Sequence, residues 1–407
     1  MRNIHRIMTL CLLPLMICAL LPASAISGEE DGFFDPVGLS YTELEEVWQD
    51  VQPPPLSEEY AFTEHLLTER IDSATGFCVT DEAIFICDMH NDRIHVYNKQ
   101  FEKIHTIRGG AQDRFSFAPR GITALPDGRV LVITDTFTTD TGYLMSYDAD
   151  FEPLEDIPFH MPNPPAYNIM EDVVVLDNGE IYLTAYCDEP ELGQIYRLQS
   201  DGSVTGAGYG LFGKLAPSVN GDQVVFVNTS FAMDPNALRR NESMYAGQSA
   251  LYQLNGGAVM RVQKLPAILR IPITDDEKAE LLTLYRAYGE ETDTLNWDTY
   301  TYDIFAHMGY TDIARFGGEY YVLAGHLPAV LVFDEDFSFR RVIPVTVRDE
   351  WSQTQGYERY MSGAEWSMVE ALYLDFDSEG TLYVLAKVVK SGVVSTDFIL
   401  LTGEKLP

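Results

Sequence analysis

A short apolar run recurs six times along the sequence, each time directly after residues that favour a tight turn. The runs are 83–87, 130–133, 181–183, 224–227, 320–323 and 382–385. Most follow Asp-Gly, Asn-Gly or Gly-Gly pairs, which are typical of β-hairpins because their turns need positive φ angles. Repetition of this kind, mostly at intervals of about 40 to 60 residues, favours a repeat architecture built from hairpins.

Each run lies between further strand-like segments, such as 121–125 before the second run and 142–147 after it. The runs are apolar without alternation, which indicates that both faces of these strands are covered. Four-stranded antiparallel sheets stacked around an axis bury their middle strands in this way, so we predict an all-β fold, a β-propeller. The alternative is a β-sandwich, which would show cleaner alternation in its outer strands and no fixed repeating unit.

The long interval between the fourth and fifth runs indicates an insertion rather than a further blade. Thr274 is followed three residues later by Glu277, as at the start of a capped helix. Apolar residues within 278–288 then recur at helical spacing. We therefore expect six blades, with a helical insertion at about 271–309.

The ends of the chain are expected to close the ring. The last unit contains only three strands and ends at 397–401, whereas 64–71 is a spare strand upstream of the first blade. Pairing the two would complete the sixth blade and remove two exposed edges. The predicted propeller therefore covers 61–407, and 26–60 form an acidic N-terminal segment or linker.

Residues 1–25 have the features of a secretory signal peptide. Arg2 and Arg6 precede a short apolar stretch, and Ala23-Ser24-Ala25 fits a signal-peptidase site. We predict cleavage after Ala25, a secreted or extracytoplasmic surface protein, and no transmembrane span in the mature chain. An uncleaved N-terminal anchor is the alternative, although the apolar stretch is short for a span.

Three cysteines remain after that cleavage, namely Cys78, Cys87 and Cys187. Three is an odd number, and a disulfide framework would need a larger, even set of cysteines. A hairpin that turns at Asp81-Glu82 places Cys78 opposite Phe85 and not opposite Cys87. Buried thiols are therefore expected in this hairpin.

The first blade contains a recognisable turn motif. Its residues are Asp88, Asn91, Arg93, Ile94, Val96 and Tyr97. This segment resembles the signature of NHL-repeat propellers, and Pro119-Arg120-Gly121-Ile122 in the second blade resembles it more weakly. The resemblance implies a six-bladed propeller whose motif is mainly structural, in a family whose members bind proteins, peptides, nucleic acids or sugars and include a few lyases and lactonases.

Charge and motifs exclude several functions. The chain has 62 Asp and Glu against 27 Lys and Arg, a formal net charge of −35, which disfavours binding to nucleic acid. The segment 208–213 has the glycine spacing of a dinucleotide site, but Pro217 prevents a proper helix after it. The serine-hydrolase, zinc-protease and paired-cysteine motifs are absent from the sequence.

Polar residues near the innermost strands form one set of candidates, at the expected central channel. They are Arg120, Glu171, Asp172, Ser218, Asp312 and Glu370. The carboxylates Glu171, Asp172, Asp312 and Glu370 could hold Ca²⁺ or another divalent cation through oxygen ligands. The alternative is a hydrated acidic ring balanced by Arg120, with no cofactor.

Aromatic residues in a polar loop form the second set of candidates. Trp351, Tyr357, Tyr360 and Trp366 lie between the fifth and sixth runs. Exposed aromatic rings beside polar groups suit recognition of a sugar or a peptide, and packing of the loop onto the propeller is the alternative. We therefore expect a binding module for an extracellular glycan, peptide or protein ligand, with Arg120 at the channel mouth. The alternative is a metal-dependent lyase or lactonase centred on the channel carboxylates, so enzymatic activity stays open at this point.

Overall fold

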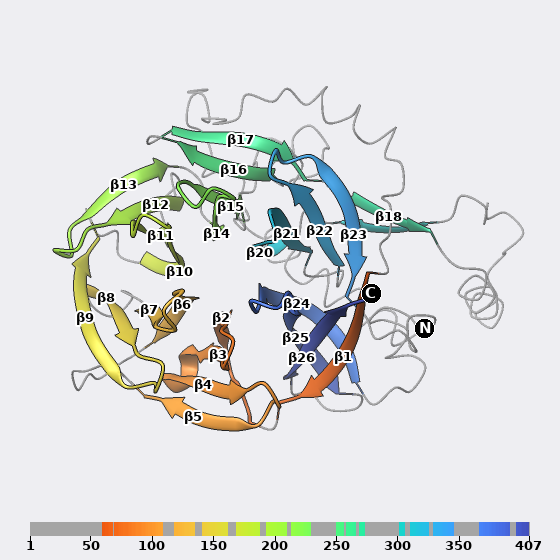
Figure 1. The fold of residues 1–407 in the computed structure, drawn as a ribbon, viewed down its shortest axis with the longest axis horizontal. Coiled ribbons are helices and arrows are strands. Elements are labelled where there is room, and N and C mark those ends of the chain that lie inside the picture. The colour runs from red at the N-terminus through yellow and green to blue at the C-terminus, as the bar shows by residue number, and fades with distance from the viewer. Residues whose placement is uncertain are drawn as a thin grey trace, which may run out of the picture. The chain divides into compact units, whose positions relative to one another are not determined.

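A computed structural model shows a six-bladed β-propeller (Figure 1). It describes residues 59–67, 69–108, 118–134, 141–161, 168–187, 193–209, 213–228, 250–255, 258–265, 268–272, 301–305, 310–324, 329–345, 366–390 and 396–406. The chain divides into two compact units, 1–39 and 40–407, and all described residues belong to the second. The predicted signal peptide and most of the acidic segment lie outside the described residues.

The first three blades are four-stranded antiparallel sheets made of consecutive strands. Blade one contains β2 (Ala74–Val79), β3 (Ala83–Asp88), β4 (Arg93–Asn98) and β5 (Lys103–Ile107), with a short 3₁₀ helix η1 (Met89–Asn91) between β3 and β4. Blade two contains β6 (Pro119–Ala124), β7 (Val130–Thr134), β8 (Thr141–Tyr147) and β9 (Pro153–His160). Blade three contains β10 (Asn168–Val175), β11 (Ile181–Cys187), β12 (Gly193–Leu198) and β13 (Val204–Tyr209).

Blades four and five follow the same plan. Blade four contains β14 (Gly213–Pro217), β15 (Val224–Asn228), β16 (Ala250–Asn255) and β17 (Ala258–Lys264). Blade five contains β20 (Tyr310–Phe316), β21 (Glu319–Ala324), β22 (Ala329–Asp334) and β23 (Phe339–Pro344). In each blade the first strand lies closest to the axis, as Figure 1 shows.

The six apolar runs are the second strands of the blades, as predicted. Every residue of β3 and of β7 is buried. Their side chains contribute to an apolar cluster that spans blades one and two, in which Phe85 and Val96 share the core with Ile122 and Val132. The prediction of strands covered on both faces is therefore confirmed.

Turn glycines connect the first and second strands. Gly128 and Gly179 have φ angles of 85° and 82°, which a residue with a side chain adopts only under strain. In each hairpin the glycine N–H donates to a carbonyl three residues earlier, Leu125 and Leu176 respectively. The Asp-Gly and Asn-Gly pairs therefore act as the sequence indicated.

The sixth blade joins the two ends of the propeller. It contains β24 (Trp366–Phe376), β25 (Leu382–Lys390), β26 (Thr396–Lys405) and β1 (Tyr60–Leu66). The edge strand β1 pairs with β26 in a register that runs from Tyr60 opposite Lys405 to Leu66 opposite Ile399. Closure by an N-terminal strand is confirmed. The strand begins four residues earlier than expected, and it ends at Leu66, after which the chain leads inward to β2.

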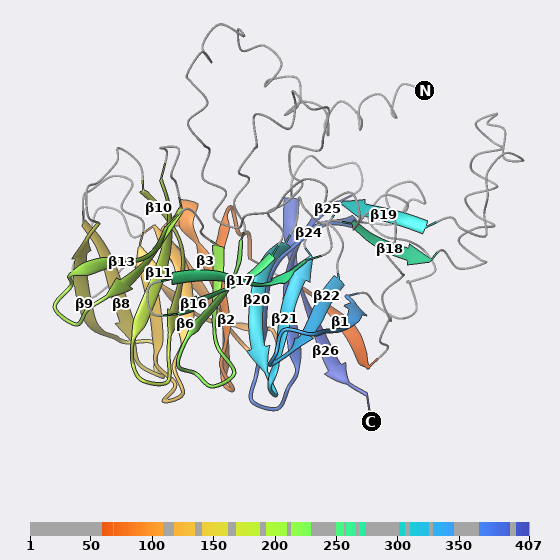
Figure 2. The same ribbon diagram turned by 90° about the horizontal axis from the view of Figure 1, so that it is seen from above.

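A two-stranded sheet lies outside the six blades (Figure 2). It pairs β18 (Ile268–Pro272) with β19 (Thr301–Phe305), so Ile268 lies opposite Phe305. These strands precede and follow the segment in which a helix was expected. The predicted helix at 278–288 lies outside the described residues and stays a prediction.

The motif of blade one forms a buried network around Asp88. Its carboxylate accepts hydrogen bonds from Asn91 Nδ2 at 2.8 Å and from Arg93 Nε at 3.1 Å. It also accepts from the backbone N–H groups of Asp72 and Ser73, and its Oδ2 lies 3.2 Å from Nε2 of His95. The contacts therefore support a structural role for the motif.

Two further expectations concern the thiols and the membrane. Cys78 lies opposite Phe85 in the β2–β3 hairpin, and the thiols of Cys78 and Cys87 are free and buried. The side chain of Cys187 lies outside the described residues. Among the helices of the described residues, none has the length and apolar character that a membrane crossing needs.

Candidate functional site

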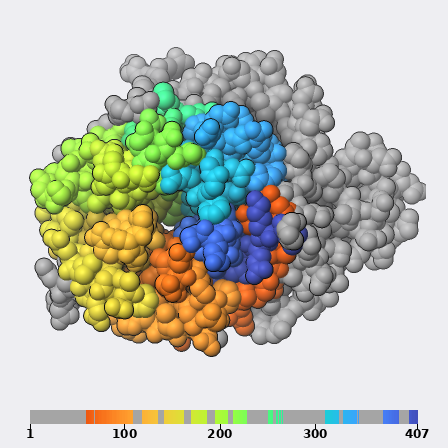
Figure 3. Space-filling model, in the orientation of Figure 1, coloured from red at the N-terminus to blue at the C-terminus, as the bar shows by residue number. Residues whose placement is uncertain are grey.

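The first strands of the blades meet around the axis and bring charged residues together there. In the space-filling view the face is hollowed where these strands meet (Figure 3). Blades three to six contribute Glu171 and Asp172 from β10, Lys214 from β14, Asp312 from β20 and Tyr373 from β24. We call these five residues the axial cluster.

Lys214 is the central residue of the axial cluster. Its Nζ donates a hydrogen bond to the backbone carbonyl of Glu171 at 2.9 Å and lies 3.3 Å from Oε1 of the same residue. The ammonium also lies 4.9 Å from the centre of the Tyr373 ring. Burial opposes the charge on Lys214, but Glu171, Tyr373, Asp172 and Asp312 together raise its pKa above the ordinary value. The side chain is therefore a fixed buried cation.

The two aspartates of the axial cluster have pKa values that burial raises. Burial raises the pKa of Asp172 to about 6, against the opposing charge of Lys214 and the N–H groups of Leu215 and Val173. Burial likewise raises the pKa of Asp312 well above its ordinary value, again opposed by Lys214. A carboxyl group that changes charge near neutral pH beside a permanent cation is suited to proton transfer.

The same aspartates also join neighbouring blades. Asp172 accepts a hydrogen bond of 2.8 Å from the backbone N–H of Leu215 in blade four. Asp312 accepts one of 2.8 Å from Leu374 in blade six. Asp375, in blade six, repeats the arrangement with Val79 of blade one at 2.8 Å. These bonds between blades explain why acidic residues occur in the inner strands, independently of any ligand.

Glycines replace the bonding aspartates where blades one, two and three meet. A β-carbon on Gly76 would lie 2.1 Å from the carbonyl oxygen of Arg120, and one on Gly121 would lie 2.7 Å from Cα of Asp172. Direct backbone packing therefore holds this side of the ring, and the space for polar side chains lies toward blades three to six.

The structure brings some of the predicted site residues together. Glu171, Asp172 and Asp312 lie around Lys214, and Arg120 lies in β6 on the side of the ring held by backbone packing. Glu370 and Trp366 belong to β24, but their side chains are outside the described part of the chain. Trp351, Tyr357 and Tyr360 lie entirely outside it.

Ser218 does not belong with the other channel candidates. It follows the last residue of β14, Pro217, whereas the channel carboxylates were expected at the starts of inner strands. Its backbone carbonyl accepts a hydrogen bond from Arg315 of blade five. Ser218 therefore lies at the junction of two blades, and the expectation that it lines the channel alongside Glu171 was wrong.

The predicted metal site can be compared with the donors present. Over the described ranges, no three His, Cys, Asp or Glu side chains are grouped so that they could hold one metal ion. One oxygen of Asp172 and one of Asp312 already accept a backbone N–H, and the nearby charge is the ammonium of Lys214. A divalent cation beside that ammonium would be repelled, so the described donors fit a lysine better than a metal.

Lys214 is the site residue that the sequence analysis missed. It was assigned no role from the sequence, whereas the structure places it second in the inner strand β14. The signal was its repeat position, because β14 precedes the turn at Asn220-Gly221 just as β10 precedes the turn at Asn178-Gly179.

Comparisons with known proteins place the fold without placing the chain in a family. No protein family model matches the sequence, and no curated protein matches it either. The solved structure of a luciferin-regenerating enzyme is similar, with a TM-score of 0.50 and 11% sequence identity, over 84% of this chain and 95% of that one. At this identity the likeness shows a shared six-bladed propeller fold.

Other similar structures have lower scores. A gluconolactonase from Xanthomonas campestris is 12% identical, with a TM-score of 0.46 over 87% of this chain and 96% of that one. A calcium-binding regucalcin from Agrobacterium tumefaciens is 11% identical, with a TM-score of 0.48 over 86% and 97%.

Proposed function

We propose that the protein is an enzyme that acts on a small polar substrate at the mouth of the central channel, by lactone hydrolysis or lyase chemistry. The observation that carries the proposal is the axial cluster, where a carboxyl group with a pKa of about 6 lies near a buried lysine that stays positive. Such a pair can accept a proton while the lysine stabilises the negative charge that develops on the substrate.

For a lactone, each group has a definite task. The ionised Asp172 takes a proton from a water molecule, whose oxygen then bonds to the carbonyl carbon. Lys214 stabilises the oxyanion that forms, and the ring C–O bond then breaks. The proton held by Asp172 passes to the departing oxygen, so lactone and water give one hydroxy acid. Glu171 positions the ammonium through its contacts of 2.9 and 3.3 Å.

The similar structures supply substrate classes to test rather than an argument. Their names include two gluconolactonases and two streptogramin-type lyases. Because the regucalcin is named as calcium-binding, the experiments below also test for a divalent cation, although the described donors surround an ammonium. The binding-module function stays a prediction, since the aromatic side chains assigned to the module are not described. The resemblance to NHL repeats also stays a prediction.

We also propose that the protein acts outside the cytoplasm, with 1–25 removed as a signal peptide. This rests on the sequence alone. N-terminal sequencing of the protein secreted by its host would show Ile26 as the first residue, whereas an intact N-terminus on a membrane-bound protein would favour the anchor.

The first test is activity on sugar lactones, with loss of turnover in two variants. Lys214→Met removes the cation, and we expect kcat/KM to fall about 10² to 10³-fold, the range seen when a group that stabilises an oxyanion is lost. Asp172→Asn removes the proton acceptor and should cost about 10² to 10⁴-fold. In the parent protein kcat/KM should rise with pH and level off above about 6, as Asp172 loses its proton.

Asp375→Asn is the matched control. Asp375 makes the same kind of bond between blades, and burial also raises its pKa to about 6, but it is not among the residues that act on Lys214. If Asp375→Asn reduces turnover as much as Asp172→Asn at equal thermal stability, the axial aspartate acts only through the fold. Metal analysis of the purified protein, with turnover before and after chelation, separates the metal-dependent alternative. Sugar or peptide binding without any turnover would favour the binding module.

A further inference from the structure

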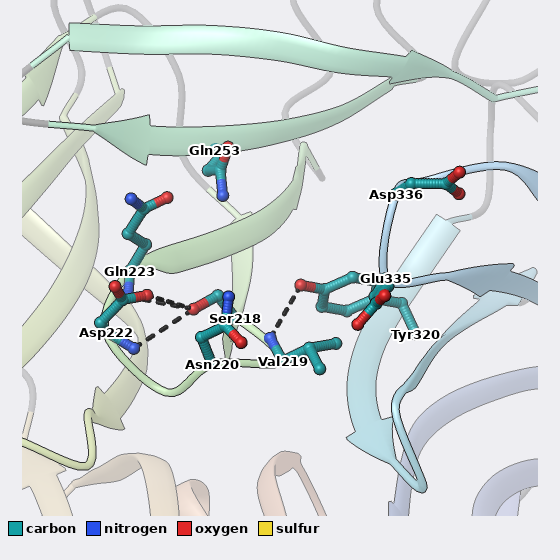
Figure 4. Close-up of a pocket in the computed structure, with 9 residues that line it drawn as sticks. All are labelled: Ser218, Val219, Asn220, Asp222, Gln223, Gln253, Tyr320, Glu335 and Asp336. Carbon is teal, nitrogen blue, oxygen red and sulfur yellow. Dashed lines mark hydrogen bonds between the residues drawn. The ribbon is translucent and has the colours of Figure 1, made fainter.

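A second polar cavity lies away from the axis, in the groove between blades four and five (Figure 4). Its volume is about 510 Å³. The residues that matter for its chemistry are Asn220, Asp222, Gln223, Gln253, Glu335 and Asp336. We call it the 4–5 groove, and it does not contain any member of the axial cluster.

The junction of blades four and five is built differently from its neighbours. In place of a bonding aspartate, Nη1 of Arg315 donates to the backbone carbonyls of Ser218 and Val219. The backbone N–H of Val219 donates to Oη of Tyr320 at 3.0 Å. The Tyr320 ring is 1% exposed and stacks on Phe337 with centroids 5.0 Å apart. The wall of the groove is therefore fixed before any ligand arrives.

Several polar side chains in this groove have no hydrogen-bond partner among the described residues. The side-chain amides of Asn220, Gln223 and Gln253 and the carboxylate of Glu335 make no hydrogen bond to any described residue. In Figure 4 Gln223 and Gln253 extend from blade four, and Glu335 lies across from them beside Tyr320. Groups that donate and groups that accept, without partners among the described residues, thus lie together on one small surface.

We propose that the 4–5 groove binds a neutral sugar or another polyol. A hydroxyl group both donates and accepts hydrogen bonds, and neighbouring hydroxyls match an amide that offers N–H and C=O together with a carboxylate that accepts. None of the residues lining the cavity is Lys, Arg or His, so an anion has no partner there. A volume of about 510 Å³ accommodates a single hexose unit with its bridging waters.

A second groove shows why the proposal is confined to this one. The groove between blades six and one has a cavity of about 580 Å³, lined by Lys99, Asp377 and Tyr383 among others. There Nζ of Lys99 contacts Asp377 Oδ2 at 3.3 Å and Tyr383 Oη at 3.1 Å, and Tyr383 donates to Asp377 at 2.9 Å. Its central polar groups are bonded to one another, so fewer remain for a ligand.

The test is titration of the full mature chain with glucose, galactose, mannose and sorbitol, followed by ligand-observed NMR. We expect at least one of them to bind with a millimolar Kd, and Gln253→Ala and Glu335→Ala each to weaken it about tenfold. Glu82→Gln, at an exposed carboxylate lining the other groove, should leave the Kd unchanged. Binding should persist in Asp172→Asn, which separates this site from the proposed reaction at the axis.

Two results would overturn the proposal. One is that none of the four compounds binds, or that binding survives both Gln253→Ala and Glu335→Ala in variants whose thermal unfolding matches the parent. The other is that spermidine binds at this groove and the sugars do not, because the groove would then recognise positive charge through Asp222, Glu335 and Asp336.

Discussion

Two aspartates, Asp88 in blade one and Asp172 in blade three, show how the same side chain can serve opposite purposes. Asp88 is buried at the end of β3 and is surrounded by hydrogen-bond donors. Asp172 is half-buried within β10, near the ammonium of Lys214, two backbone N–H groups and the carboxylate of Glu171. Burial opposes the ionisation of Asp88, but hydrogen bonds from His95, Asn91, Ser73 and Asp72 lower its pKa below the usual range.

The contrast distinguishes a structural acid from one that is available for chemistry. Asp88 stays ionised near neutral pH, so it is unsuited to exchanging protons in a reaction there. Asp172 has a pKa of about 6 and changes its charge near neutral pH. The balance between burial and the donors around the carboxyl group therefore decides which role it can take.

Removing Asp88 should give the largest effect. Asp88→Ala leaves the N–H groups of Asp72 and Ser73 and the side chains of Asn91, Arg93 and His95 without their acceptor. We expect a loss of about 4 to 5 kcal/mol in the free energy of unfolding, as for a broken buried ion pair. Urea unfolding at pH 7 measures it.

The pH dependence of the parent protein checks the same point. Because the folded pKa of Asp88 lies below its unfolded value of about 3.9, its contribution is complete above that pH and is lost as the pH falls further. The free energy of unfolding of the parent should therefore approach that of Asp88→Ala as the pH falls below about 4. Asn91→Ala removes a single donor and serves as control, and an equal loss in both variants would contradict the shared network.

Removing Lys214 should have a smaller effect that depends on pH. Lys214→Met leaves the carboxyls of Glu171, Asp172 and Asp312 without a cation, and we expect a loss of about 3 kcal/mol in the free energy of unfolding at pH 8. The folded pKa of Asp172 is already above its unfolded value, so this group favours folding at low pH and that benefit is lost as the pH rises toward 6.

In Lys214→Met the pKa of Asp172 should rise further, because no cation lies beside the carboxyl group. The loss of stability with rising pH should therefore continue to a higher pH than in the parent. At pH 5 the carboxyl is largely protonated in both proteins, and the difference between them should shrink to about 1 kcal/mol. Parallel thermal unfolding from pH 5 to 8 measures it. A difference that does not vary with pH would mean that Lys214 contributes packing rather than charge.

The architecture could be predicted from the sequence because its signals are local. Turn pairs such as Asn178-Gly179 and the unbroken runs after them fix a hairpin and the burial of its second strand. Six such units in one chain leave few arrangements, and closure by the N-terminal strand follows from the missing strand of the last blade. The bounds of β1 were not predicted correctly, because apolar residues at Leu67 and Ile71 continue past Leu66, where the pairing with β26 ends.

The axial cluster could be predicted only in part, because its members come from four blades. The acids were identified from their repeat positions, but a sequence does not show that Asp172 and Asp312 bond to Leu215 and Leu374 of the next blades. Lys214 was overlooked because its strand has only five residues and follows glycines that resemble a loop. A divalent cation at the axis was one of two alternatives, and among the described residues the cation near these carboxylates is Lys214.

The smallest expected effect belongs to Asp375, which shares features with both aspartates compared above. Like Asp172 it is half-buried with a pKa of about 6, and its two oxygens accept N–H groups of Val79 and Phe376, both at 2.8 Å. Asp375→Asn keeps one acceptor and places an NH₂ group against the other N–H, at a cost of about 1 kcal/mol at pH 5. Because the parent loses stability as the pH rises toward 6 and this carboxyl ionises, the deficit should shrink by pH 8. Unfolding curves at both values measure it, and a deficit that grows with pH would mean that the ionised form of Asp375, like that of Asp88, is the stabilising one.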